Sequence, residues 1–412
     1  MKKKTIVLTV IMFLSLTVVA QAQDKKKTIE VPEWVANLTE RIELHGYGQA
    51  GYTWKNQDGR NTNTIDLKRT LFWAKARITD RWSFLFMHDF SSVVQEFYTD
   101  FRITNDNALT VRFGQFKNSY TLENPLSPTK MELIDVYSQG VTYLSGCGSD
   151  PLFGVQYGRD LGLMLYGNLF ANHLYYELAL MQGQGINIKD KNSQKDVILR
   201  LDYRPVENWR IVASGQLGTG HAVAESKYNP TIAVGDDYKR NRWSAGAEWK
   251  SHVAGVDYWK NRAASVHGEV LGGKDGDVNS WGAYLTGCVP VCKILDVVGS
   301  VDYFNYNTDA KMQQTNVTLG VQHWFYRTCR VQVQYTLSNP VNMDQGEGMM
   351  PGFDVSGFSA ETPTETARPG RAVLAVSANR RFSQDCEILV NATTLFTPAA
   401  RLTTKQKKER NA

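Results

Sequence analysis

The sequence predicts an all-β protein, a transmembrane antiparallel β-barrel of about 16 strands, within a range of roughly 16 to 18. Three observations lead to this prediction: an export leader, a two-residue alternation of polar and apolar side chains, and short connections that alternate with long ones. An exported chain built from many alternating strands is typical of the bacterial outer membrane.

The N-terminus has the three parts of a secretory signal peptide. Three lysines at 2–4 precede an apolar run over 5–20, and a small-x-small pattern at 20–22 provides a cleavage site. A membrane anchor is the alternative, but the apolar run is shorter than the roughly 20 residues that span a bilayer. We therefore expect residues 1–22 to be a cleaved signal peptide.

The remaining chain divides into an extension, a barrel and a tail. We expect residues 23–40 to be a periplasmic N-terminal extension, 41–396 the transmembrane β-barrel and 397–412 a polar C-terminal tail. Beyond the leader, no segment is long and apolar enough for a transmembrane helix. The mean hydropathy of −0.36 suits a barrel, whose strands alternate lipid-facing and lumen-facing residues.

The alternation is clearest between residues 68 and 78. One face carries Arg69, Leu71, Trp73, Lys75 and Arg77, and the other carries Thr70, Phe72, Ala74, Ala76 and Ile78. A later segment alternates in the same way, with Arg200, Asp202 and Arg204 against Leu199, Leu201 and Tyr203. Because a charge facing lipid costs about 2–4 kcal/mol at mid-bilayer, we assign the charged faces to the lumen.

Connections rich in Gly, Asn, Asp, Lys or Pro separate the strands. The short connections are predicted at 79–81, 105–107, 205–208, 251–254 and 326–329. The longer ones are predicted at 56–65, 118–135, 185–194, 219–238, 272–278 and 339–368. Tight turns at one end and long loops at the other are typical of an outer-membrane barrel.

Strand assignment near the C-terminus is ambiguous. Both 371–382 and 386–396 have strand character, which gives an odd total, and the region 135–160 is a candidate for a further strand. The last strand of a barrel often ends in an aromatic residue, for which Phe382 and Phe396 are both candidates.

Six basic residues are the candidate pore-lining set: Arg69, Lys75, Arg77, Arg112, Arg200 and Arg204. In one interpretation they form a basic wall that attracts anions. In the other they are structural, and pair across a hydrated wall with Asp89, Asp100 and Asp202. Five tryptophans near strand ends suit interfacial girdles better than sugar-stacking platforms; they are Trp54, Trp82, Trp243, Trp249 and Trp281.

Other chemistry is weakly represented. Five cysteines occur, Cys147, Cys288, Cys292, Cys329 and Cys386, in a chain expected in an oxidising compartment. The segment 288–292 resembles a hairpin turn across which two thiols could meet; alternatively, all five are small apolar fillers. No zinc spacing and no hydrolase or nucleotide motif occurs, so we predict no enzyme, no metal and no cofactor. A net charge of +5 is too small to indicate nucleic acid.

Several segments in order resemble the phosphate-selective porin O and P family of Gram-negative outer membranes, over most of the chain from about Gly46 to Ser338. They are Lys68-Arg69 with Lys75-Ala76-Arg77, His88-Asp89-Phe90, Asp100 to Ile103, Arg112 to Lys117, and the hairpin segments from Val317 to Tyr335. The resemblance implies a barrel of about 16 strands, usually a homotrimer, with an anion-favouring pore lined by Arg and Lys. The 118–135 loop is nevertheless net acidic in this chain, through Glu123, Glu132 and Asp135 against Lys130.

These observations together predict a porin in the outer membrane of a Gram-negative bacterium. It would contact outer-membrane lipid and pass small hydrophilic solutes, with a preference for anions or phosphate. The alternative is a barrel that acts mainly as a binding or structural protein. A receptor with a plug domain is disfavoured, because only residues 23–40 precede the barrel.

Overall fold

The computed structural model describes residues 41–57, 60–134, 137–251, 262–326, 329–343, 353–359 and 386–387. The predicted leader, extension and tail lie outside these residues. The strands are β1 Ile42–Gln57, β2 Arg60–Arg77, β3 Trp82–Asp89, β4 Val94–Arg102, β5 Thr110–Lys117, β6 Arg159–Leu169, β7 Leu174–Met181, β8 Asp196–Tyr203, β9 Trp209–His221, β10 Asp237–Lys250, β11 Ser265–Asp275, β12 Val278–Cys292, β13 Leu295–Asn307, β14 Met312–Tyr326, β15 Cys329–Val341, β16 Phe353–Ser359 and β17 Cys386–Glu387. Among the described residues, helical turns occur at η1 Pro128–Lys130 and α3 Gln139–Leu144. No helix in this part of the chain is long and apolar enough to cross a membrane.

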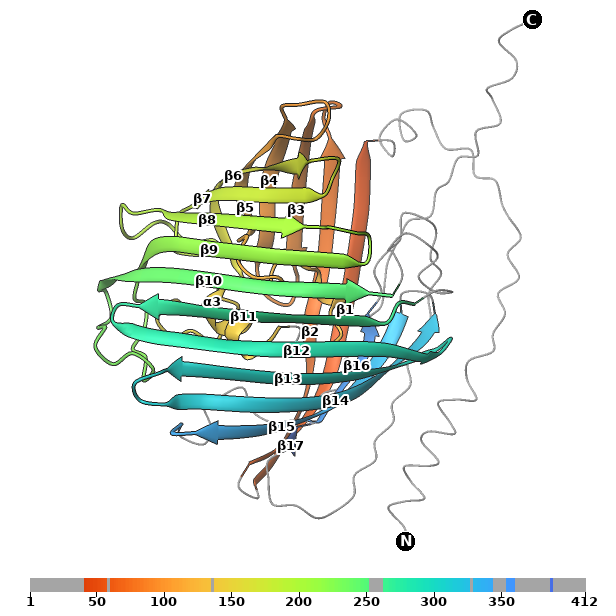
Figure 1. Ribbon diagram of the computed structural model, residues 1–412, viewed down its shortest axis with the longest axis vertical. Helices are drawn as coiled ribbons and strands as arrows, with labels where there is room; N and C mark the ends of the chain where they lie inside the picture. The colour runs from red at the N-terminus through yellow and green to blue at the C-terminus, as the bar shows by residue number, and fades with distance from the viewer. Residues whose placement is uncertain are drawn as a thin grey trace, which may run out of the picture.

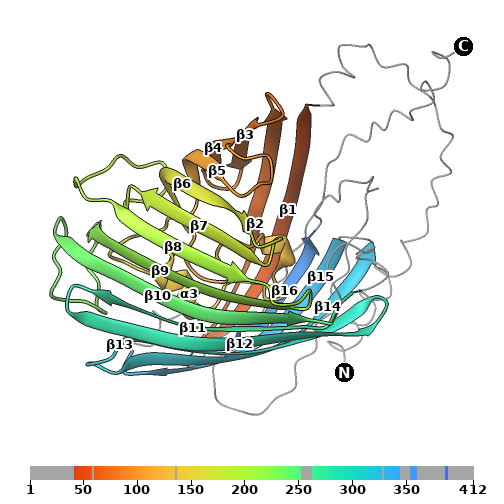
Figure 2. The same cartoon turned by 45° about the horizontal axis from the view of Figure 1, so that its top comes forward.

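The strands form one closed antiparallel sheet (Figures 1 and 2). Each strand from β1 to β16 pairs with the next strand along the chain, and β16 also pairs with β1, with Gly51 opposite Ser356. The two residues of β17 lie at the same seam, beside β1 and β15. The predicted antiparallel barrel of about 16 strands is thus confirmed within the described residues.

The barrel wall is apolar outside and polar inside. In β8 the side chains of Asp196, Arg200 and Asp202 are each 1% exposed, whereas Val197 and Leu199 are each 45% exposed. A soluble β-sandwich would bury the apolar row instead. This reversal is the pattern expected of a barrel whose outer surface contacts lipid.

The connections at the two ends of the barrel differ in length. At one end, here called the turn end, the short connections are 78–81, 103–109, 170–173, 204–208 and 293–294, and the longer connection 251–264 lies at the same end. At the other, called the loop end, lie the long segments 118–158, 182–195 and 222–236 together with a few short turns. The predicted division into short and long connections therefore holds for most hairpins.

Two predicted loops are strands in the structure. Residues 272–278 belong to β11 and β12 apart from a turn at 276–277, and Gly272 lies opposite Trp243. An added Cβ at Gly272 would lie 2.9 Å from the Trp243 ring, so this glycine makes room for an aromatic side chain rather than a turn. The predicted loop 56–65 is instead the tip of a long hairpin that pairs Gln57 with Arg60. Its residues 61–66 are exposed on both faces, so no alternation marked them as strand.

Two further connections differ from prediction at the turn end. The connection predicted at 251–254 extends to 264, because β11 begins at Ser265. The segment 288–292 is the end of β12 rather than a turn, and the turn follows at 293–294. A register shift between Pro290 and Cys292 accommodates the proline, as expected at a bulge. Cys288 and Cys292 are both free thiols, as are Cys147 and Cys329.

The predicted loop 339–368 was also wrong in part, since it contains β16. Glycines and prolines interrupt its sequence, but pairing with β15 on one side and β1 on the other fixes the strand. Its tertiary context therefore outweighs its low intrinsic strand propensity. The segment 371–382 lies outside the described residues, and only Cys386–Glu387 of 386–396 is described as strand. The region 135–160 contains α3 rather than a further strand.

Candidate functional site

The loop 118–158, between β5 and β6, folds into the interior of the barrel and is here called the internal loop. Leu122, Glu123 and Asn124 are fully buried, and the backbone N–H of Leu122 donates to the Glu269 carboxylate of β11 at 2.8 Å. Farther along, the N–H of Ile134 donates to Gln334 of β15 at 3.0 Å. The loop therefore crosses the lumen and narrows it (Figure 1).

Helix α3 fixes the far part of the internal loop against β11 and β13. Ser138 caps the helix by accepting a hydrogen bond from the N–H of Val141 at 3.3 Å, which satisfies an otherwise unpaired donor. An added Cβ at Gly140 would lie 2.8 Å from the Phe304 ring, so only glycine allows this close approach. The N–H of Gln139 also donates to Asp302 at 2.7 Å.

A cluster of aromatic rings closes this half of the lumen toward the loop end. Tyr143 of α3 lies edge-on to Tyr306 of β13, with ring centroids 5.2 Å apart. Tyr228, from the 222–236 loop, stacks on Tyr306 at 4.5 Å and lies edge-on to Tyr143 at 5.8 Å. Two loops thus pack into the β10–β13 side, and a cavity remains beside β1–β6.

The barrel wall binds two acidic residues of the internal loop. Glu123 accepts a hydrogen bond from His267 of β11 at 3.1 Å, and Glu132 lies 3.9 Å from the other ring nitrogen of His267. Glu132 also accepts a hydrogen bond from Ser265 at 2.9 Å. These two carboxylates therefore share one histidine of the wall.

The base of the internal loop carries a group of cations. Lys117, at the end of β5, donates to the carbonyl of Asn124 at 2.8 Å and to the Tyr137 hydroxyl at 3.0 Å. Its ammonium also interacts electrostatically with Arg69, Arg159 and Glu96. We call Arg69, Lys117 and Arg159 the cationic cluster.

One carboxylate partly offsets the cationic cluster. Arg159 pairs with Glu96 at 2.9 Å, whereas Arg69 donates to the neutral amide of Gln49 at 2.8 Å. Arg159 was missed in the sequence, because it begins a strand directly after an irregular loop and no alternation precedes it. Nothing in the local sequence could have placed it next to Arg69.

Three of the predicted pore-lining residues are held by carboxylates, as the structural interpretation expects. Arg112 forms two hydrogen bonds with Asp100, at 2.8 and 2.9 Å, and lies 3.8 Å above the Tyr98 ring. Arg200 is buried, donates to the carbonyl of Thr121 in the internal loop and lies 3.8 Å from Asp202. Arg204 pairs with Asp202 at 3.1 Å. Asp89 contacts backbone and Ser91 rather than an arginine.

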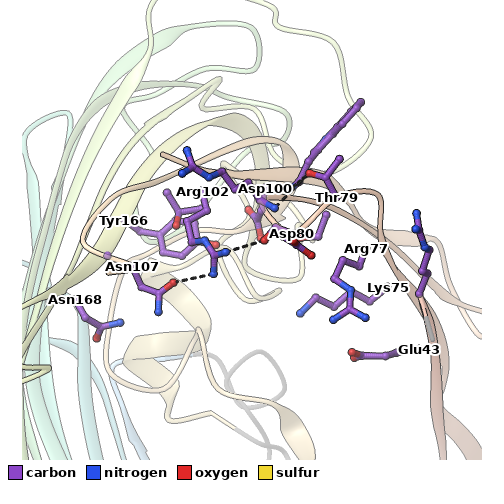
Figure 3. Close-up of a pocket in the computed structure, with 16 residues that line it drawn as sticks. Glu43, Lys75, Arg77, Thr79, Asp80, Asp100, Arg102, Asn107, Tyr166 and Asn168 are labelled. Atoms are coloured by element: carbon purple, nitrogen blue, oxygen red, sulfur yellow. Dashed lines mark hydrogen bonds between the residues drawn. The ribbon is translucent and has the colours of Figure 1, made fainter. Parts of the chain in front are cut away.

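The other predicted residues lie along β2. Arg69 belongs to the cationic cluster, and Lys75 and Arg77 line a cavity of about 430 Å³ at the turn end of the lumen. Five basic and three acidic residues line this cavity, which we call the turn-end cavity (Figure 3). Within the described residues, no group of three or more His, Cys, Asp or Glu side chains is placed to hold a metal ion.

No protein-family profile matches the chain, and no curated protein matches its sequence. Solved structures do match. An anion-selective porin from Comamonas acidovorans superposes with a TM-score of 0.55 at 15% identity, covering 86% of this chain and 99% of the porin. OprB of Pseudomonas putida gives a TM-score of 0.55 at 10% identity, covering 82% and 98%. OmpT of Vibrio cholerae, in its trimer form, gives 0.51 at 14% identity, covering 86% and 100%. The chain has the porin fold.

The porin fold and the apolar outer surface agree on where the protein lies. The exposed apolar side chains include Trp82, Trp243 and Trp281, at 42–51% exposure, as expected of side chains that contact lipid and its interface. The barrel therefore lies in the outer membrane of a Gram-negative bacterium, as predicted.

Proposed function

We propose that this porin-fold barrel is a passive channel for small hydrophilic solutes, with a preference for anions. The observation that carries the proposal is the cationic cluster, which lies at the base of the internal loop that narrows the lumen. Two arginines and the Glu96 carboxylate are among the groups that act most strongly on Lys117. Fixed charge at a narrow point sets ion selectivity.

Bilayer recordings test both parts of the proposal. The purified barrel is reconstituted in a planar bilayer under a potassium chloride gradient, and we expect discrete conductance steps with a chloride-selective reversal potential. Replacing Arg69 with Gln removes one cation, which we expect to lower the chloride-to-potassium permeability ratio about twofold, from an interaction of roughly 0.5 kcal/mol typical of a solvated charge.

Lys239→Gln is the matched control, because Lys239 is an exposed cation that alternates with buried neighbours in β10 and so faces outward. Its permeability ratio should equal that of the unmodified protein. Absence of conductance steps would reject the channel, and a cation-selective potential would reject the anion preference alone.

Two finer expectations are part of this proposal. The resemblance to the phosphate-selective porin O and P family supports phosphate as one of the anions. Phosphate added during a recording of the chloride current should then reduce that current.

The trimer form of OmpT, which shares the fold, supports a homotrimer here. The mass of the detergent-solubilised protein would test this expectation.

The alternative function is that of a binding or structural barrel. The packing of two loops into the β10–β13 half of the lumen favours it, since a fully occupied lumen would not conduct. The bilayer experiment separates the two functions directly.

A further inference from the structure

The turn-end cavity presents different chemistry on its two sides (Figure 3). Lys75 and Arg77 project from β2 on one side. Tyr166 and Asn168 of β6 and Asn107 of the neighbouring turn lie on the other side, with one phenol and two amides. We call the first the cationic side, on which Glu43 lies opposite Lys75 in the β1–β2 pairing. We call the second the amide side, on which Arg102 is bound to Asn107.

Lys75, on the cationic side, carries charge that is available to a solute. Lys75 forms no hydrogen bond or ion pair within the described part of the chain. Arg112, Arg200 and Arg242, in contrast, are bound to Asp100, Asp202 and Asp275. A bound carboxylate would therefore find its charge partner at Lys75, with Arg77 two residues along the same face.

Hydrogen bonds hold the amide side in a fixed position. Arg102 donates to the Asn107 side chain at 3.3 Å and to the carbonyl of Asp80 at 2.8 Å, which holds the turn in place. Amides both donate and accept, and the Asp80 and Asp100 carboxylates add acceptors to the lining. Such a surface matches a ligand rich in hydroxyl groups, which also donate and accept.

We propose that the turn-end cavity is a binding site for sugar acids, that is, monosaccharide-sized anions with one carboxylate and several hydroxyl groups. The cavity volume of about 430 Å³ lies in the range of small-molecule sites. A neutral sugar provides no charge partner for Lys75, and a small inorganic anion leaves the amides hydrogen-bonded to water alone. Only a ligand with both features satisfies both sides. This inference rests on the proposed channel, because a solute reaches the cavity through the lumen.

The probe is D-glucuronate, compared with D-glucose and acetate. Each is titrated onto single channels from the turn-end side. We expect glucuronate to reduce the current at concentrations at least tenfold lower than glucose, which lacks the charge, or acetate, which lacks the hydroxyl groups. Equal potency of the three probes would overturn the proposal.

Substitutions test the contribution of each side of the cavity to glucuronate binding. Lys75→Gln and Arg77→Gln should each raise the half-blocking glucuronate concentration at least fivefold and leave the weak effect of glucose unchanged. Asn168→Ala should weaken glucuronate and leave acetate unchanged. Lys239→Gln, on the outer face, should behave as the unmodified protein. Unaltered glucuronate block in Lys75→Gln and Arg77→Gln would overturn the proposal.

Calorimetric titration of the detergent-solubilised barrel measures glucuronate binding independently of conductance, and so tests the binding site separately from the channel function. Glucuronate binding that Lys75→Gln weakens, in a barrel without conductance, would support the site and reject the channel. Conductance without glucuronate binding would reject the site and leave the channel.

Discussion

At the scale of single residues, buried arginines connect the barrel wall to the loops inside it. Arg242 of β10 forms two hydrogen bonds with Asp275, at 2.6 and 3.0 Å, and lies 4.0 Å from Asp150 of the internal loop. Its side chain is 1% exposed. Removing one member of a buried charged group leaves the others without compensation in a low-dielectric site.

Arg242→Leu should therefore destabilise the barrel by about 3–5 kcal/mol, measured by urea unfolding in detergent micelles. Arg204→Gln is the comparison, because its side chain is 44% exposed and Asp202 keeps Arg210 as a partner at 2.6 Å. That change should cost less than about 1 kcal/mol. Similar losses for the two variants would contradict the assignment of Arg242 as a buried anchor.

Asp150 gives the internal loop a dependence on pH. Burial raises the pKa of Asp150 to about 7, and the Asp275 carboxylate acts in the same direction, while Arg242 and Arg240 oppose the increase. The ordinary value is 3.8, so the folded loop favours the protonated form. The stability that this proton contributes is fully present below the ordinary pKa and is lost as the pH rises through about 7.

Current fluctuations from the internal loop should consequently increase between pH 6 and pH 8, roughly one unit on either side of that pKa. Asp150→Asn mimics the protonated form, so its single-channel noise should stay flat across this interval. Noise that rises equally in both proteins would show that another group is responsible.

At the scale of elements, strands were predictable and the internal loop was not. The alternation of Arg200 and Asp202 with Leu199 and Leu201 identified β8 and the direction of its faces, because each strand of a barrel contacts lipid on one side. The same rule fails for α3, whose burial depends on Leu271 and Phe304, far away in sequence. It also fails for the β1–β2 tip, which is exposed on both faces.

Gly140 tests how α3 is positioned. Valine at this position would place its Cβ within 3.1 Å of both Phe304 and Leu271, and overpacking of this kind costs about 1–3 kcal/mol. Because α3 is short and lies on a loop, we expect it to move away from the wall, which would change the unit conductance in bilayer recordings.

The matched control is Gly299→Ala in β13, where an added Cβ would meet only Leu319, at 3.8 Å. Its conductance should equal that of the unmodified protein. An unchanged conductance in Gly140→Val would show that α3 does not limit the passage.

At the scale of the whole molecule, the predictable part of the fold is the pairing between strands that follow one another along the chain. Hairpins join β1 through β16 in chain order, so the barrel follows from recognising its strands. The candidate site depends instead on contacts such as Ile134 with Gln334, 200 residues apart. Such contacts leave no periodic signal in either segment. Lys117 and Arg159 are partners in the β5–β6 pairing, but the irregular loop 118–158 between them hides where β6 begins, so the sequence did not place them together.

The seam between β1 and β16 has a consequence for how the protein assembles. Fifteen of the pairings around the ring join consecutive strands, whereas Gly51 must find Ser356 across most of the chain. Loop-closure entropy makes such long-range contacts slow relative to local hairpins. The internal loop joins β5 to the adjacent β6, so it can enter the interior as one segment without passing through another loop. We therefore expect an open, curved sheet to form first around this loop, and the last two strands to close over an interior that is already packed.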